Sequence, residues 1–187
     1  METKEHPKTD FLGKLSDTAL LMLMVFSFGG IFGFVYEELF YRIDLGYFVK
    51  RGTTFGPWIP IYGFGAVLIL LTANHFRHRP ATVFLISAAI CGLLEYITGL
   101  VLLRMGGIRL WDYNTEIWNW GNLGGFVCAR SVIFFGISAL LLLYVVCPLL
   151  LRLWKTIGTP AFRVIAVGSA CLFAFDILIS LLIRLGG

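Results

Sequence analysis

The chain has 187 residues, of which 58% are hydrophobic and only 14% are charged. Soluble domains average roughly 45–50% apolar and about 25% charged residues, so this composition excludes an ordinary soluble protein and indicates an integral membrane protein embedded in a lipid bilayer. The net charge of +4 is not gathered into a basic run, so we expect no nucleic-acid partner.

Five apolar segments follow one another along the chain, and a membrane-spanning helix needs about 20 mostly apolar residues. The segments run from Ala19 to about Phe40, from about Pro60 to Ala73, from Ala81 to Leu103, from about Gly125 to Leu151 and from about Phe162 to Ile183. The second segment is short. We therefore predict an all-α integral membrane protein, a bundle of about five transmembrane helices. Residues 1–18 form a cytoplasmic N-terminal tail in this prediction, and residues 19–187 form a single transmembrane domain.

The distribution of lysine and arginine favours a cytoplasmic N-terminus, because positive residues are enriched in cytoplasmic loops. Eight fall on the side of the N-terminus (Lys4, Lys8, Lys14, Arg77, Arg79, Arg152, Lys155, Arg163) and six on the opposite side (Arg42, Lys50, Arg51, Arg104, Arg109, Arg184). In this orientation the two long loops, residues 41–58 and 104–122, face the extracytoplasmic side. We expect a multi-pass protein of a bacterial plasma (inner) membrane.

Three ionisable residues lie well inside apolar segments, namely Glu95, Arg130 and Asp176. Such placement costs roughly 2.5–3.5 kcal/mol on insertion scales, so these side chains usually face the protein interior or a wet cavity. At about 1.5 Å per residue, all three lie on the order of 10 Å below the end that carries the long loops. We expect a polar pocket there, with Arg130 as the counter-charge of Glu95. A purely structural role in holding the helices together stays open.

The two long loops supply further candidates for this pocket. Glu37 lies near the end of the first apolar segment, and Arg51 follows in the loop. Asp112, Tyr113 and Asn122 lie in the second loop, which is rich in tryptophan and could cover the pocket. Aromatic residues also gather at membrane interfaces without binding a ligand, and Asp112 could brace its own loop, so both alternatives stay open. We predict that Glu37, Arg51, Glu95, Asp112, Tyr113, Asn122, Arg130 and Asp176 bind a substrate.

The stretch Lys50–Ala66, KRGTTFGPWIPIYGFGA, interrupts the apolar pattern with glycines and prolines. Proline is tolerated in the first turn of a helix, where its missing N–H would have no partner. We therefore predict that Pro60 begins the second helix.

A weak internal similarity suggests two related helical hairpins followed by one more helix. Glu37 precedes Gly65 by 28 residues, and Glu95 precedes Gly125 by 30 residues. Some transporters are built from repeated units of this kind, but a chance similarity explains so few matches equally well.

Sequence motifs of common enzymes are absent. The chain contains no GxxxxGK[ST], HExxH or GxSxG pattern, so it lacks the phosphate loop with which many ATPases bind nucleotide. The four cysteines lie in or beside apolar segments and have the pattern of packing residues. We assign no catalytic residue, metal ligand or cofactor, although a carboxylate-based intramembrane enzyme stays open.

The motifs KRGTTFGPWIPIYGFGA, LLEYITG, WDYN, NWGN and GGFVCARS together resemble those of the CmpB-like family of bacterial type IV ABC-transporter permeases. The resemblance covers about Phe32 to Gly136. It implies a small multi-pass membrane protein related to transport and names no substrate class. The matching positions are Glu37, Arg51, Gly52, Gly56, Pro57, Pro60, Tyr62, Gly63, Glu95, Trp111, Asp112, Tyr113, Asn122 and Gly124. The family usually has a bulky apolar residue near Arg130, so the pairing with Glu95 would be particular to this chain.

Together these observations predict a transporter or permease with an intramembrane polar pocket that opens to the extracytoplasmic side. Five helices are few for alternating access, so we expect a homo-oligomer or a separate ATPase subunit. Two alternatives stay open: a membrane-embedded enzyme acting on a lipid or lipid-linked substrate, and a non-catalytic membrane sensor or assembly factor.

Overall fold

The structure, a computed structural model, describes the backbone of residues 7–186 and the side chains of residues 16–183. The described residues form helices and no strand, so the predicted all-α fold is confirmed. The helices are α1 (Pro7–Leu45), α2 (Pro60–Thr72), α3 (Pro80–Gly106), α4 (Ala129–Leu141) and α5 (Cys147–Gly186). A 3₁₀ turn, η1 (Ala73–Phe76), follows α2, and a π-helical turn, η2 (Leu142–Val146), joins α4 to α5.

The beginnings of these helices follow from local sequence. Pro60 begins α2, as predicted, and Pro80 begins α3. Helix α1 begins at Pro7, within the segment that we expected to be a tail, and residues 1–6 of that segment lie outside the described residues.

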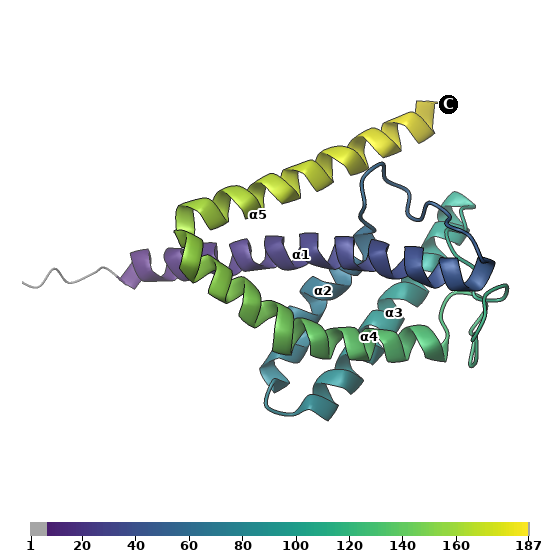
Figure 1. Cartoon of the computed structure of the whole chain (residues 1–187), viewed down its shortest axis with the longest axis horizontal. Coiled ribbons are helices and arrows are strands. Elements are labelled where there is room, and N and C mark those ends of the chain that lie inside the picture. Colours follow the sequence, from purple (N-terminus) through teal and green to yellow (C-terminus); the bar gives the residue numbers. More distant parts are fainter. Residues whose placement is uncertain (1–6, 187) are drawn as a thin grey trace, which may run out of the picture.

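A sharp turn at Gly158 divides α5. Its φ of 79° and ψ of 161° lie outside the helical region, in a conformation that essentially only glycine adopts. Pro160 follows and fits the first turn of a new helix. Figure 1 shows that the chain after this turn runs back along α1.

By length and apolar composition, three helical stretches of the described residues could cross a membrane. They are Ser16–Leu45, Pro80–Gly106 and Ala129–Ile183, and the last of them contains the turn at Gly158. The helix Pro60–Phe76 is also apolar but shorter. The structure therefore supports a membrane protein with three long apolar helices.

Small residues let α1 and α2 approach closely. A Cβ atom on Gly29 would lie 2.7 Å from the Cβ of Ala66 and 2.8 Å from the carbonyl oxygen of Tyr62. Close packing of this kind matters in lipid, where the hydrophobic effect does not drive helices together. The adjoining core is formed by Val25, Ala66, Ile69, Ala73, Val83, Cys91, Ala139, Leu142, Leu143, Val146 and Cys147, so it joins α1, α2, α3 and the α4–η2–α5 rod.

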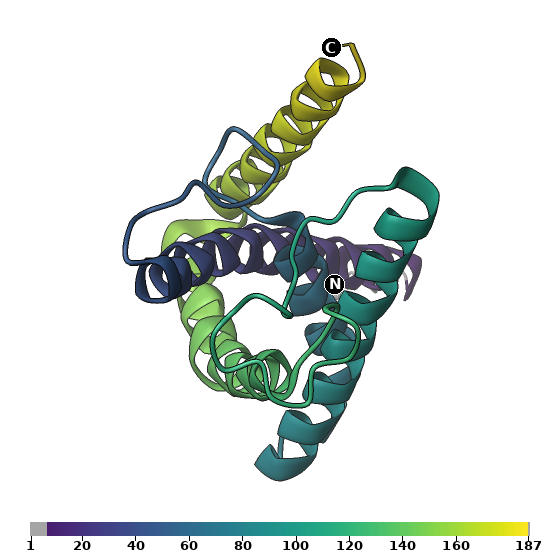
Figure 2. The same cartoon turned by 90° about the vertical axis from the view of Figure 1, so that its right-hand side faces the viewer.

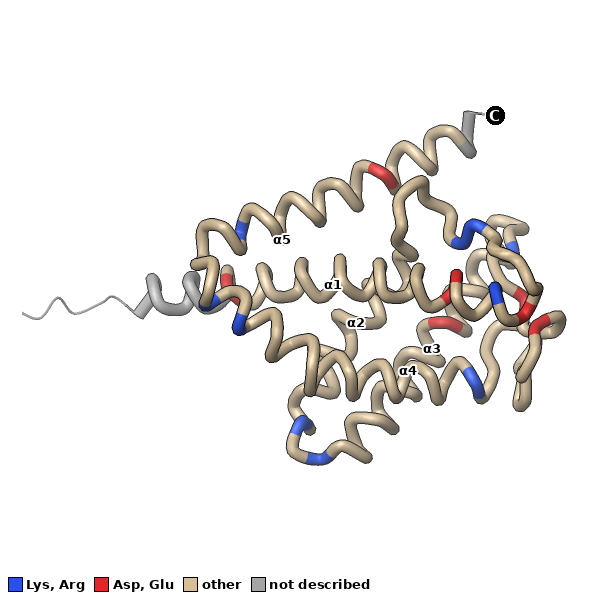
Figure 3. The backbone as a smooth tube through the Cα atoms, viewed as in Figure 1, with Lys and Arg blue, Asp and Glu red and all other residues tan. Residues whose placement is uncertain are grey.

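Both long loops lie at one end of the helices, where α1 and α3 end and α2 and α4 begin (Figures 1 and 2). The backbone N–H of Ile117 donates a hydrogen bond to Asp44 Oδ1 at 3.1 Å, and this bond joins the second loop to the end of α1. Figure 3 shows most of the acidic residues at this end, whereas lysines and arginines also lie at the opposite end of the helices and in the turn between α2 and α3. Most of the acidic residues are therefore concentrated beside the two loops.

The two hairpins that we expected to be related do not match at their glycines. Gly65 lies inside α2, whereas Gly125 lies in the loop before α4. These two residues therefore occupy different structural positions.

Candidate functional site

A cavity of about 80 Å³ lies between the helices beneath the two loops. A water molecule needs roughly 10–15 Å³ of such space, so the cavity has room for several waters or a small polar molecule. Its lining combines aromatic rings with ionisable groups drawn from α1, the first loop, α3, the second loop and α4. The ionisable members with opposite charges are Glu37, Glu95, Glu116, Arg51 and Arg130.

Three carboxylates line the cavity, and each of them accepts one hydrogen bond from a tyrosine hydroxyl. A tyrosine places a donor beside the carboxylate while its ring packs among apolar neighbours. The pairs are Glu37 with Tyr62 at 3.1 Å, Glu95 with Tyr113 at 2.5 Å, and Glu116 with Tyr41. The three carboxylates differ in the group that binds their second oxygen.

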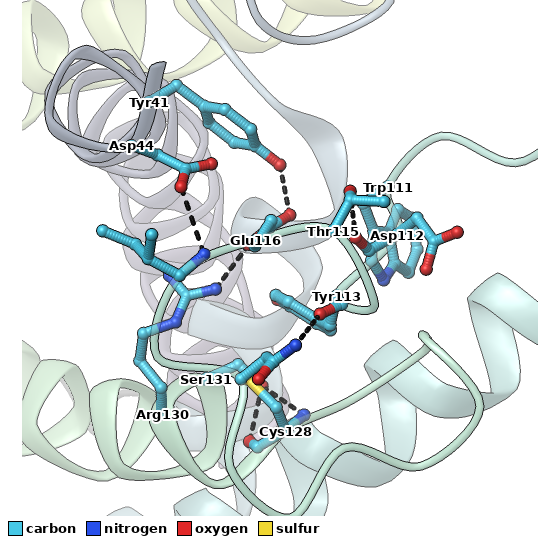
Figure 4. Close-up of polar contacts among 12 residues, drawn as sticks. Tyr41, Asp44, Trp111, Asp112, Tyr113, Thr115, Glu116, Cys128, Arg130 and Ser131 are labelled. Carbon is cyan, nitrogen blue, oxygen red and sulfur yellow. Dashed lines mark hydrogen bonds and ion pairs between the residues drawn. The ribbon is translucent and has the colours of Figure 1, made fainter. Parts of the chain in front are cut away.

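The second oxygen of Glu37 and of Glu116 is bound by an arginine. Arg51 Nε lies 3.0 Å from Glu37, and its guanidinium stacks over the Tyr41 ring with its carbon 3.7 Å from the ring centroid. Arg130 Nη2 lies 2.5 Å from Glu116. Figure 4 shows Tyr41 and Arg130 converging on Glu116. Each of these two carboxylates therefore has a positive partner.

Glu95 differs because its second oxygen faces Ser131 Oγ at 2.9 Å instead of an arginine. Ser131 Oγ also lies 2.9 Å from the carbonyl oxygen of Cys128. A hydroxyl has one hydrogen to donate, so these two acceptors compete for it. Glu95 is 6% exposed and has no positive partner among the described residues.

The expected pair of Glu95 with Arg130 is therefore wrong. Arg130 lies at the beginning of α4, where the second loop returns Glu116 to within reach of its guanidinium. Arg130 also stacks over the ring of Phe40, at 3.8 Å from its centroid. Counting charges on helices missed this partner because Glu116 lies in a loop.

The pKa values of the loop groups follow from burial. Burial raises the pKa of the Tyr113 hydroxyl well above its usual value, and the charge of Glu95 adds to the rise, so Tyr113 stays protonated as a donor. Burial also raises the pKa of Glu116, while its bond from Tyr41 and the charge of Arg130 oppose the rise. Burial alone would lower the pKa of Arg51, but Glu37 and the other nearby groups raise it overall.

Asp112 braces the loop that presents Tyr113. Its Oδ1 accepts the backbone N–H of Asn114 at 3.0 Å and the side-chain amide at 2.7 Å, and its Oδ2 pairs with Arg109 at 2.7 Å. Asp112 is not among the residues that line the cavity. The structure therefore favours the bracing alternative for Asp112.

Asn122 has a similar place in the second loop. It donates to Asn114 Oδ1 at 2.7 Å and accepts the N–H of Gly125 at 2.8 Å. Gly125 has a φ of +81°, and a Cβ there would lie 2.7 Å from Arg109 Nη2, so a side chain would disturb the brace. Asn122 is not among the residues that line the cavity, and its hydrogen bonds stabilise the second loop.

Asp176 lies on α5, away from the cavity lining, and binds the first loop. It accepts hydrogen bonds from the backbone N–H groups of Phe55 at 3.0 Å and Gly56 at 2.8 Å, and from the indole of Trp58 at 2.6 Å. Its charge is therefore compensated by N–H donors. We call this group, Asp176 with Phe55, Gly56 and Trp58, the α5 latch.

Of the eight residues predicted to bind a substrate, the structure brings five together around the cavity: Glu37, Arg51, Glu95, Tyr113 and Arg130. The sequence prediction omitted Glu116, Ser131 and two of the three tyrosines that bind the carboxylates, Tyr41 and Tyr62. Glu116 follows WDYN by two residues, and its position inside the Trp-rich second loop was the available signal. Ser131 carries no charge and gave no comparable signal.

Two residues of the cavity lining, Arg130 and Ser138, each have one buried side-chain atom without a hydrogen-bond partner among the described residues. The atoms are Arg130 Nε and Ser138 Oγ, and both are buried within the protein. A buried donor without a partner is unfavourable by about 1–3 kcal/mol. The described residues contain no group of His, Cys, Asp and Glu that could hold a metal ion.

Comparisons with known proteins point to a family and to no individual relative. Neither the curated proteins nor the solved structures give a match. The family model described as "Putative ABC-transporter type IV" matches residues 24–181, a wider range than the motifs alone indicated. The chain therefore belongs to this family of membrane proteins.

Proposed function

We propose that the protein is the membrane-embedded, permease-type part of a transporter and that its cavity binds the transported substrate. The observation that carries the proposal is Glu95, a buried carboxylate without a cationic partner among the described residues, in a cavity between apolar helices. Ionisable residues in such places usually mark a pathway for a substrate or ion. Family membership supports the same class of function.

The proposed topology has about five membrane crossings. It counts Pro60–Phe76 as a short crossing and divides Ala129–Ile183 at the Gly158 turn into two. The bias of lysine and arginine favours a cytoplasmic N-terminus in a bacterial inner membrane. The cavity then opens to the extracytoplasmic side, where the two loops lie.

Energy for transport would come from another subunit. The chain has no GxxxxGK[ST] phosphate loop, so a separate ATPase is the natural partner of a permease of this family. Assembly as a homo-oligomer would provide further helices for a change between inward-facing and outward-facing states.

A deletion strain tests this function with the native partners present. We expect deletion to change the ratio of intracellular to extracellular concentration of at least one small solute, measured by mass spectrometry. Wild-type protein should restore the ratio, whereas Glu95→Gln at equal membrane abundance should not. Full restoration by Glu95→Gln would contradict the role of the cavity, and changed lipids with unchanged solute ratios would contradict transport.

A further inference from the structure

We infer that the cavity recognises a small organic cation, a protonated amine, with Glu95 as its counter-charge. This inference rests on the proposed function and names the chemical class of the ligand. It arises from a comparison of the three carboxylates that line the same cavity.

The charges of the lining leave one carboxylate without a positive partner. The lining contains the carboxylates of Glu37, Glu95 and Glu116 but only two guanidinium groups. Arg51 pairs with Glu37, and Arg130 pairs with Glu116. An uncompensated buried charge is strongly unfavourable. A cationic ligand would give Glu95 the partner that the other two carboxylates already have.

Glu95 also has free capacity to accept hydrogen bonds. Its two oxygens have about four acceptor sites, and the structure fills at most two of them, from Tyr113 and Ser131. Because Ser131 must also serve the carbonyl of Cys128, the second bond is shared. An ammonium group carries several N–H donors and would satisfy the remaining sites.

The walls of the cavity favour an organic cation over a hydrated inorganic one. Aromatic residues from α1, α4 and the second loop line it, including Phe32, Tyr36, Phe134 and Trp111. The rings of Tyr36 and Phe134 stack with their centroids 3.5 Å apart. Aromatic faces attract cations whose hydration shell has been removed. Phe40 and Tyr41 already stack under Arg130 and Arg51, so the lining uses this interaction with its own cations.

Three probes of nearly equal size and different charge test the inference on the purified full chain in lipid nanodiscs. They are ethanolammonium, which is positive, ethylene glycol, which is neutral, and glycolate, which is negative. We expect only ethanolammonium to raise the thermal unfolding midpoint in a saturable way, because a ligand that binds the folded state stabilises it. Saturation by glycolate, or by none of the three, would overturn the inference.

Glu95→Gln locates the binding. We expect its affinity for ethanolammonium to fall roughly tenfold to a hundredfold, because a hydrogen bond to a charged group is lost. Asp176→Asn, outside the cavity, should bind as the wild type does. Equal ethanolammonium binding by Glu95→Gln and the wild type would also overturn the inference. The comparison of the three probes needs only the wild-type protein. It therefore tests the inference even if Glu95→Gln folds poorly.

The amine could come from a free solute or from a lipid headgroup, and nanodisc composition separates these sources. In discs of phosphatidylglycerol alone, ethanolammonium should bind. If phosphatidylethanolamine in the disc raises the unfolding midpoint of the wild type but not of Glu95→Gln, and added ethanolammonium then has no further effect, the headgroup is the ligand. If phosphatidylethanolamine has no such effect, a free amine is the ligand. The transport test remains independent, because Glu95-dependent movement of a solute other than an amine would support the proposed function and contradict this inference.

Discussion

The cavity and the α5 latch solve the same physical problem in different ways. Each contains a carboxylate on an apolar helix, Glu95 on α3 and Asp176 on α5. Asp176 is bound by three N–H donors of the first loop. Glu95 is bound by two hydroxyls, one of them shared, and lies in a cavity with space beside it.

The difference shows what an acidic residue in an apolar helix does and does not predict. It predicts that the charge needs partners, because an isolated charge at that depth is unfavourable. It does not predict whether the partners belong to the protein. For Asp176 a folded loop supplies them, and for Glu95 the protein supplies only part of the set.

The ion pair of Glu116 and Arg130 gives the largest expected effect. Its side chains are 5% and 12% exposed, and removing one partner of a buried pair typically destabilises by about 3–5 kcal/mol. We expect Arg130→Met and Glu116→Gln each to lower the free energy of unfolding by about that amount, measured by titration with SDS in mixed micelles. The double variant should lose clearly less than the sum, and additive losses would show that the two side chains do not depend on each other.

The contact between α1 and α2 gives an intermediate effect. A Cβ on Gly29 would lie too close to Ala66 and to the backbone of Tyr62. We expect Gly29→Ala to lower the free energy of unfolding by about 1–3 kcal/mol, the usual range for overpacking. Gly168→Ala is the matched control, because a Cβ there meets nothing within 4 Å. An equal change in the free energy of unfolding in the two variants would mean that α1 and α2 do not pack as closely as described.

The α5 latch gives the smallest effect. Asp176→Asn removes the charge while keeping one oxygen as an acceptor, so we expect a loss of about 1 kcal/mol in unfolding free energy. Ser180→Ala removes only the 3.4 Å contact to Asp176 and should change stability less. Asp176→Asn should also leave transport intact, and a loss of transport as large as that of Glu95→Gln would remove the distinction between latch and cavity.

Much of the fold could be predicted from the sequence, because apolar segments and prolines have local meanings. Pro60 marked the beginning of α2, and the apolar segments located all the long helices. Helix α1 begins at Pro7, before the apolar segment that begins at Ala19, so Lys8 and Lys14 lie in the helical stretch. Helix can extend beyond the apolar part of a segment, and composition does not detect this extension.

The candidate site was less predictable because its partners are distant in the chain. Glu37, Arg51, Glu95, Tyr113 and Arg130 were identified from charge or motif. The pairing of these residues was not predicted, because Arg130 binds Glu116 in the second loop and not Glu95, the carboxylate that we expected at the same depth. Pairing depends on how a 22-residue connection from Gly107 to Cys128 folds, and neither periodicity nor depth determines that.

An experimental high-resolution structure of the protein, crystallised from a lipidic phase, tests the central claim most directly. Our account predicts non-protein density in the cavity, in contact with the Glu95 carboxylate and absent when Glu95→Gln is crystallised under the same conditions. A cavity closed by protein side chains, with Glu95 bound to Arg130, would contradict it.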